Sequence, residues 1–278
     1  MSKYARIRDL LAEDGFYSFD CAPFADPDVV KLAHDSEYVD GFLHGTLSAQ
    51  AIRRIGFPWS EGLVRRTLAS VGGTLCATAE ALETGWGGNL AGGTHHAFRG
   101  EGSGFCVFND IAVAIEWLRA AGRIERAAVI DLDVHQGDGT AWIFEEDPAV
   151  LTASMHCQVN FPFRKQRSSI DIEMPQGTGD GAYLEALEEL LPRVLAFDPE
   201  IVFYQSGVDT LASDTLGRLA LSHGGLLHRD RMVMEAVRRE DVPFVVTLGG
   251  GYSKPVELTA LAHANTFRTA REVFGIEQ

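Results

Sequence analysis

The segment AAVIDLDVHQGDG, residues 127–139, places acidic and imidazole side chains at the end of an apolar run. Its first four residues are apolar, and Asp131, Asp133, His135 and Asp138 follow within eight positions. Alternate residues of an extended chain point to one side, so the first three of these groups share a side. An uncompensated buried charge is strongly destabilising. The groups must therefore form a hydrogen-bonded ion network or hold a metal ion.

Asp209 favours the metal site. It follows a second apolar run, within YQSGVDT at residues 204–210. Together with Asp133 and His135 it would complete an Asp-His-Asp site with a position open for water, which is typical of catalytic rather than structural zinc. The ion network remains the alternative interpretation of the first segment taken alone.

A pair of histidines, His95 and His96, lies in AGGTHHAF at residues 91–98. Neither histidine lies on an apolar periodic face, which disfavours a packed core role, although a surface loop would also fit. Beside a metal, one imidazole could take a proton from water while a carboxylate fixes its tautomer. Asp131 and Asp138 are left over from the metal set and supply one carboxylate for each histidine.

Tyr252 follows three glycines in LGGGYS, residues 248–253. Glycines allow positive φ and close approach of the backbone, so the tyrosine would project from a tight turn. Its hydroxyl could donate a hydrogen bond to an oxygen that acquires negative charge. Taken alone, the same motif fits an ordinary turn at the exit of a strand.

The elements that must position these groups alternate along the chain. Helical patterns are predicted at residues 1–15, 63–83, 110–120, 183–197 and 226–239, with Asn109 or Asp110 as the cap of the third. Strand-like apolar runs occur at residues 127–130, 150–153, 201–204 and 244–248. Such runs between helices predict a single three-layer α/β/α domain with a mainly parallel sheet. The carboxyl ends of parallel strands form the binding edge, and the polar motifs follow these strands.

Composition excludes several classes of protein. The 278 residues are 46% hydrophobic, which is enough for one sizeable core. The net charge of −15 argues against nucleic-acid binding and is compatible with a cationic substrate or with solubility alone. The four cysteines form no CxxC pair, so neither a disulfide framework nor a thiolate zinc site is expected. Without a membrane span or a signal peptide, we expect a cytoplasmic protein with no membrane partner.

The motifs together resemble the histone deacetylase superfamily, in particular its class IV-like bacterial branch. The resemblance runs from about Met1 to His263, in the family's order, and rests on GGTHHAFRGEGSGFCVFND, DLDVHQGDGT, NFPFRK, GTGD, YQSGVDTLASDTLGRL and LGGGYS. It implies an arginase/deacetylase fold of about eight parallel strands in one domain over residues 1–278. The chain starts inside the family's first helix, so the family's usual N-terminal strand is expected to be absent.

The resemblance also assigns the site. It implies zinc, with ferrous iron as the alternative, bound by Asp133, His135 and Asp209. His95 and His96 match the catalytic pair, backed by Asp131 and Asp138 respectively, and Tyr252 matches the tyrosine that polarises the carbonyl. Between the two histidines, we favour His96 as the acting base.

Two further sets of residues follow from the resemblance alone. Substrate contacts are expected from Gly104, Phe105, Gly250 and either Phe161 or Phe163. A structural potassium ion is expected at Asp131, Asp133, His135 and Ser154.

The predicted function is metal-dependent hydrolysis that removes acetyl or other acyl groups from an N-acylated amine, foremost acyl-lysine. The partner would be an acylated protein or a small-molecule amine. Acetylpolyamines or small acetamides are alternative substrates, and a non-catalytic acyl-lysine-binding pseudoenzyme is an alternative function. Dinuclear ureohydrolases of the same fold need a carboxylate at Gly137 and are excluded. Oligomeric state is not readable.

Overall fold

The predicted strands lie together in one parallel sheet. The computed structural model describes residues 2–275. The four apolar runs form β2 (Ala127–Asp131), β3 (Val150–Cys157), β5 (Val202–Gln205) and β6 (Phe244–Thr247). Two more strands, β1 (Trp86–Gly88) and β4 (Ile170–Met174), complete the order β1-β6-β5-β2-β3-β4, and every pairing is parallel.

The sheet of the described residues has six strands rather than the expected eight. The sequence patterns missed β1 because it is only three residues long and two of these are glycine. They missed β4 because its residues alternate between buried ends and polar, more exposed positions, as suits an edge strand rather than a continuous apolar run. The mainly parallel sheet itself is confirmed.

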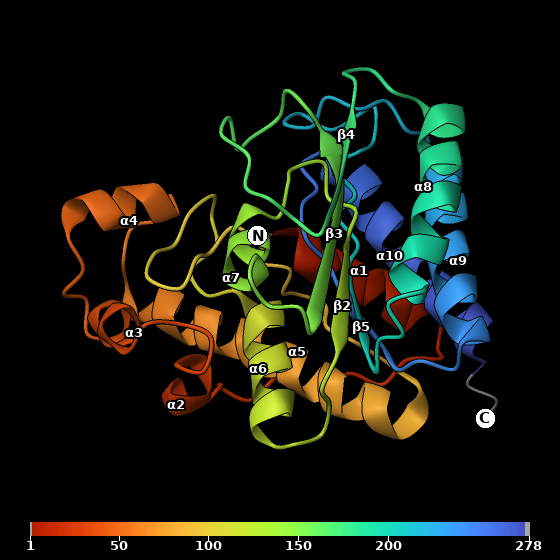
Figure 1. Ribbon diagram of the computed structural model, residues 1–278. Helices are drawn as coiled ribbons and strands as arrows, with labels where there is room; N and C mark the ends of the chain where they lie inside the picture. The colour runs from red at the N-terminus through yellow and green to blue at the C-terminus, as the bar shows by residue number, and fades with distance from the viewer. Residues whose placement is uncertain (1, 276–278) are drawn as a thin grey trace.

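Helices cover both faces of this sheet (Figure 1). One face carries α1 (Ser2–Glu13), α8 (Asp180–Leu195), α9 (His223–Arg239) and α10 (Val256–Phe274), and the other carries α5 (Glu61–Thr84), α6 (Asp110–Ala120) and α7 (Asp138–Phe144). The short helices α2 (Pro27–Val30), α3 (Ser36–Leu43) and α4 (Ala49–Ile55) add to the second side. Met1, part of the first predicted helix, lies outside the described residues.

The central strand β2 separates two hydrophobic cores. Ala128 and Ile130 pack into the core beneath α8, α9 and α10, while Ala127 and Val129 pack into the core beneath α5 and α6. Because both faces are buried, the strand reads as a continuous apolar run. The charged groups that follow it therefore emerge at the edge of a dry interior and need partners.

Side-chain caps fix where several helices begin. Ser60, Asn109 and Ser222 accept hydrogen bonds from backbone N–H groups of α5, α6 and α9, at 3.1, 3.0 and 2.9 Å. Asn109 is thus the cap of α6, which leaves the neighbouring Asp110 free for a different role. No helix in the stretch 2–275 is long and apolar enough to cross a membrane.

His34 links the second side of the molecule to the N-terminus of α6. Its Nδ1 lies 2.9 Å from the Phe98 carbonyl oxygen, and its Nε2 accepts the Asn109 N–H at 2.8 Å. Only a neutral imidazole can accept that bond. Burial lowers the pKa of His34 to about 4, against the opposing effect of its backbone hydrogen bonds.

This histidine should make the fold sensitive to acid. The pKa of His34 is about 4 in the folded chain and 6.5 when unperturbed, so the unfolded chain binds more protons between these values. The stability that depends on neutral His34 is present above pH 6.5 and is lost as the pH falls towards 4. We expect the fall in unfolding free energy between pH 7 and 4.5 to be about 2 kcal/mol smaller in His34→Gln than in the wild type.

Urea unfolding at the two pH values measures this difference. The exposed His44, which lies 2.8 Å from the Asp40 carbonyl oxygen, provides the control variant His44→Gln with a wild-type pH response. An equal pH response in His34→Gln and the wild type would contradict the assignment.

Candidate metal centre and its cavity

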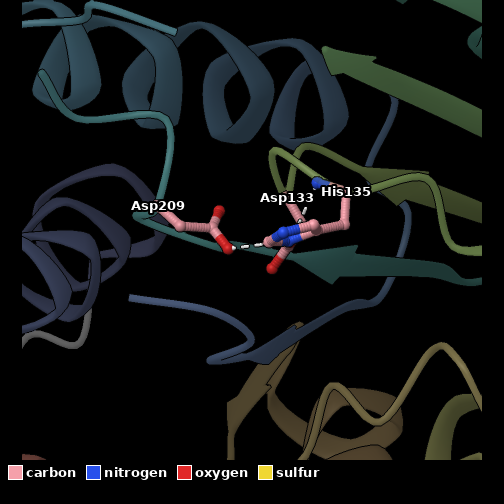
Figure 2. A group of neighbouring side chains, drawn as sticks. All are labelled: Asp133, His135 and Asp209. Carbon is pink, nitrogen blue, oxygen red and sulfur yellow. Dashed lines mark hydrogen bonds and ion pairs between the residues drawn. The ribbon is translucent and has the colours of Figure 1, made fainter. Parts of the chain in front are cut away.

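Three predicted metal ligands converge at the carboxyl ends of β2 and β5. Asp133 and His135 come from the segment after β2, and Asp209 from the segment after β5 (Figure 2). One ligand atom of each residue lies within 4.8 Å of the other two. His135 Nδ1 is 2.9 Å from Asp133 Oδ1 and 3.2 Å from Asp209 Oδ2. The sequence separation of the ligands is therefore closed by two adjacent strands of the sheet.

This group has the properties of a cation site. Two carboxylates and one imidazole form a donor set that suits Zn²⁺ or Fe²⁺. Asp209 Oδ2 is buried and has no hydrogen-bond partner within the described chain apart from the ion-pair contact with His135 Nδ1 at 3.2 Å, while its Oδ1 accepts the Val134 N–H at 2.8 Å. Burial and the charge of Asp133 raise the pKa of Asp209 to about 7. A divalent cation would relieve this crowding of buried negative charge.

Gly250 keeps the space beside the ligands open. Its N–H donates to Asp133 Oδ2 at 2.8 Å. A Cβ atom at this position would overlap Asp209 Oδ2 and would lie 2.8 Å from Asp133 Oδ2. Only glycine allows the backbone to approach both carboxylates so closely.

His95 is held by Asp131 beside the metal ligands. Its Nδ1 is 2.6 Å from Asp131 Oδ2, and its Nε2 is 4.0 Å from Asp133 Oδ1. Burial opposes protonation, but the charges of Asp131 and Asp133 outweigh it and raise the pKa of His95 to about 9. These carboxylates therefore favour the protonated form of His95.

His96 is held in the same way but has the opposite electrostatics. Its Nδ1 is 2.6 Å from Asp138 Oδ1, and the ring centroids of His95 and His96 are 4.1 Å apart. Burial and the neighbouring charge of His95 lower the pKa of His96 to about 4, against the effect of Asp138. Burial and His95 therefore favour the neutral form of His96, which can accept a proton.

The loop that carries both histidines is fixed by the start of α6. Asp110 accepts the N–H groups of Gly93 and Thr94, at 3.0 and 2.7 Å, and the Thr94 hydroxyl at 2.6 Å. Asn109 Nδ2 donates to the Thr140 hydroxyl at 2.9 Å, which ties the start of α6 to α7. This is the role of Asp110 that helix-capping arguments did not predict.

Arg229 bridges the two segments that follow β2 and β5. It is fully buried in α9, and its Nη1 donates to the Leu132 and Gly207 carbonyl oxygens, at 3.2 and 2.7 Å. Its Nη2 pairs with Asp230 at 2.7 Å. Leu132 precedes the ligand Asp133, so Arg229 fixes the backbone on which the metal group stands.

We expect Arg229→Met to lower the free energy of unfolding by about 3–5 kcal/mol, because Asp230 would remain as a buried charge without its cation. Equilibrium urea unfolding gives the value. Arg239→Met removes an exposed arginine of the same helix, 3.3 Å from Glu235, and should cost less than about 1 kcal/mol. Equal losses in the two variants would contradict a central structural role for Arg229.

The metal group opens into a cavity of about 640 Å³. Both histidines, Asp133, His135 and Asp209 line it, as do all the predicted substrate contacts: Gly104, Phe105, Phe161, Phe163 and Gly250. Tyr252 also lines it and is 43% exposed, with its N–H bonded to Asp214 Oδ2 at 2.6 Å. The predicted metal ligands, both histidines, the predicted substrate contacts and Tyr252 therefore meet around one cavity.

The walls of this cavity differ in depth. Phe161 packs edge-on against His96, with ring centroids 5.0 Å apart, whereas Phe163 is 92% exposed. Gly104 has a left-handed φ of 53°, and a Cβ there would lie 2.6 Å from His96 Cδ2. Phe105 is also left-handed, at φ 67°, and packs on Phe57 with centroids 5.1 Å apart. Of the two candidate phenylalanines, Phe161 forms the inner wall and Phe163 the rim.

The predicted potassium ligands lie on adjacent strands. Asp131 of β2 pairs in register with Ser154 of β3, and Asp131 Oδ1 accepts the Asp133 N–H at 3.1 Å. The Ser154 hydroxyl lies 3.0 Å from His156 Nδ1. The potassium site, which also includes His135, stays a prediction.

Several residues of the cavity region were not identified from the sequence. Lys3 Nζ donates to the Gly249 carbonyl oxygen at 2.9 Å and lies 5.2 Å from the Tyr252 ring centroid. Tyr4 and Arg66 line the cavity wall. These are single polar residues on amphipathic helices, so periodicity gave no signal for them. Asn160, whose Nδ2 is 3.4 Å from His135 Nε2, lies in an irregular segment without a pattern.

Comparison with known proteins agrees with this geometry. A family model described as "Histone deacetylase domain" matches residues 1–267. An uncharacterized protein from Picosynechococcus sp. is 45% identical over 281 residues, which cover 99% of this chain and 93% of the relative. Histone deacetylase 2 from Arabidopsis thaliana is 33% identical over 267 residues, which cover 91% of this chain and 69% of the relative. The crystal structure of an HDAC homolog from Aquifex aeolicus matches with a TM-score of 0.81 at 26% identity, covering 99% of this chain and 82% of that one.

Proposed function

Because the chain belongs to the histone deacetylase family, we propose that it is a metal-dependent hydrolase that removes acyl groups from N-acylated amines, foremost acyl-lysine. The observation that carries the proposal is the placement of the Asp133, His135 and Asp209 group beside the His96–Asp138 pair on one cavity. An amide hydrolase needs an electrophilic centre, a base for water and a donor for the leaving amine at one place. The Asp133, His135 and Asp209 group would hold the electrophilic metal, and His96 would act as the base and as the donor.

The metal would be held by Asp133, His135 and Asp209, with zinc favoured and ferrous iron as the alternative. When bound, it would supply Lewis-acid polarisation of the amide carbonyl and activation of water. A structural potassium ion near Asp131 and Ser154 remains part of the proposal.

The proton transfers fall to His96. As a neutral imidazole oriented by Asp138, it takes a proton from the attacking water and later delivers it to the leaving amine. His95, held by Asp131 and favoured in its protonated form, would add positive charge near the tetrahedral oxyanion. Tyr252 lines the same cavity and would donate a hydrogen bond to that oxygen.

The cavity walls favour an acylated protein or a neutral amide over an acetylpolyamine. Arg53 and Arg218 line the cavity, are exposed and pair with no carboxylate among the described residues, so they would repel a polycation at its mouth. Lys165 does not line the cavity, and its ammonium donates to the Asn160 and Pro162 carbonyl oxygens at 2.6 Å each. We infer that the amine partner is lysine-like and carries one charge when free. A single domain and a cytoplasmic location stay predictions.

The test is hydrolysis of an acetyl-lysine peptide by protein reconstituted with zinc or with ferrous iron. We expect release of acetate and free lysine, measured by mass spectrometry, and loss of both after chelation. A protein that binds one metal per chain and hydrolyses neither acetyl-lysine nor longer acyl-lysines would contradict the proposal. It would favour the acyl-lysine-binding pseudoenzyme.

A further inference from the structure

Arg66 is a cation without a counter-ion in the wall of the cavity. It lies in the first turns of α5, and its guanidinium carbon is 5.0 Å from the Phe57 ring centroid. Its Nη1 is buried and has no hydrogen-bond partner, and Arg66 forms no ion pair with any residue in the described range 2–275. A buried guanidinium nitrogen left unpaired is destabilising unless a ligand completes it.

Arg66 is half-buried and lines the cavity that holds the metal group. It lines the main cavity and also a small adjoining cavity of about 30 Å³, and Thr94, next to His95, borders both. Burial lowers the pKa of Lys3 to about 8, the charges of Asp209 and Asp133 oppose this, and Arg66 adds to it. The charge of Arg66 therefore acts on the Lys3 ammonium group, as do the charges of Asp133 and Asp209.

Tyr4 provides a second polar group beside Arg66. Burial raises the pKa of Tyr4, while the nearby charge of Arg66 acts in the opposite direction. Both residues line the main cavity. A guanidinium with an adjacent hydroxyl is a donor set that matches the two oxygens of a carboxylate.

The charges of the cavity point to the same ligand. Four arginines line it, and of these only Arg54 is paired with a carboxylate, that of Glu101, among the residues described. The lining carboxylates, Asp133 and Asp209, belong to the metal group. A chain with a net charge of −15 thus presents a cationic wall outside its metal site. An apolar acyl chain would leave Arg66 unpaired, whereas an acyl chain that ends in a carboxylate would pair it.

We propose that Arg66, assisted by Tyr4, binds a carboxylate at the end of the substrate's acyl group, so that the substrates include lysine amides of dicarboxylic acids. This inference rests on the proposed function. The amide C–N bond breaks, water adds its hydroxyl to the acyl carbon and its proton to the amine, and the products are a dicarboxylic acid and free lysine. Arg66 and Tyr4 are substrate-binding groups in this scheme and take no part in the proton transfers.

The experiment compares peptides that carry succinyl-lysine with peptides that carry succinamoyl-lysine, its neutral amide isostere. We expect the wild-type protein to show a kcat/KM ratio of about 10 to 100 in favour of the succinyl peptide, because a charge-assisted bidentate pair replaces a neutral contact. Arg66→Gln should bring this ratio close to one, and Arg66→Lys should leave an intermediate value. Thermal unfolding of each variant shows whether it is folded.

Arg65→Gln is the matched control. Arg65 is the preceding residue of α5, is exposed and lies 3.6 Å from Glu61. The substitution removes the same charge from the chain and should leave the wild-type ratio intact. If Arg65→Gln and Arg66→Gln changed the kcat/KM ratio equally, the effect would come from the net charge of the chain, and the inference would be overturned.

Three further outcomes separate the inference from the proposed function. Turnover of acetyl-lysine with a succinyl-to-succinamoyl ratio near one would overturn the inference and leave the hydrolase. Calorimetry could instead show charge-dependent binding of the succinyl peptide that is lost in Arg66→Gln, with no turnover of any acyl-lysine. That result would support carboxylate binding by Arg66 and overturn the proposed hydrolase function. Weaker inhibition by free acetate in Arg66→Gln, with an unchanged ratio, would assign the carboxylate to the released product and overturn the substrate assignment.

Discussion

Asp209→Asn is expected to reduce kcat/KM for an acyl-lysine peptide by roughly 10³-fold or more, because the metal loses an anionic ligand and with it the polarisation of the carbonyl. The substitution separates two functions of one side chain. Asparagine can retain the acceptor for the Val134 N–H, which Asp209 Oδ1 binds at 2.8 Å. It removes the charge of Oδ2, the buried oxygen that lies 3.2 Å from His135 Nδ1.

The same variant should have opposite effects on stability with and without metal. In the metal-free protein, loss of a buried charge beside Asp133 should leave the free energy of unfolding equal to the wild type or higher. In excess metal, the wild type should gain about 4 kcal/mol at 1,000 times its dissociation constant, and the variant should gain much less. Thermal unfolding with and without zinc measures both. A variant that is equally stabilised by zinc would contradict the assignment of Asp209.

His96→Ala is expected to lower kcat by about 10²- to 10⁴-fold with metal binding retained, because it removes the group that transfers protons. His96 is 5% exposed, and its ring centroid lies 5.9 Å from that of His135, so it flanks the metal group without being one of its ligands. Single-turnover hydrolysis of an acetyl-lysine peptide gives the rate, and elemental analysis gives the metal content.

Two comparisons sharpen this result. His44→Ala removes an exposed histidine of the region after α3 and should retain wild-type turnover. Asp138→Asn should give a smaller loss than His96→Ala, because the imidazole remains but loses the partner 2.6 Å away that fixes its tautomer. A fully active His96→Ala protein would transfer the base role to another group.

The sheet was predictable where burial on both faces produced continuous apolar runs. This is the case for β2, β3, β5 and β6, each fully buried along its length. In β1 the packing replaces apolar side chains with glycine: a Cβ at Gly87 would overlap the Ala77 carbonyl oxygen of α5. Such a strand is set by tertiary contact and leaves little trace in a local pattern.

The metal group was predictable from chemistry and strand parity. Asp133 and His135 share one side of an extended segment, and only the parallel pairing of β2 with β5 was needed to bring Asp209 to them. Matching bases to carboxylates predicted one carboxylate for each histidine, and the family resemblance assigned Asp131 to His95 and Asp138 to His96. Both pairs lie at 2.6 Å.

The rest of the cavity was not predictable, because it depends on how irregular segments and helices meet. Phe161 and Phe163 have the same residue type and parity, yet one packs on His96 and the other is exposed. In the sequence, nothing distinguishes Arg66 from the other charged residues near the start of α5. Its lack of a counter-ion among the described residues emerges only when distant segments enclose it.

The most direct test of metal-dependent hydrolysis at this site is a titration of metal-free protein with zinc, followed by acetate release from an acetyl-lysine peptide. Turnover should rise in proportion to bound zinc and level off at one equivalent per chain, and a parallel titration of Asp209→Asn should stay flat. Full turnover in the metal-free protein, or a titration of Asp209→Asn that follows the wild type, would contradict the account.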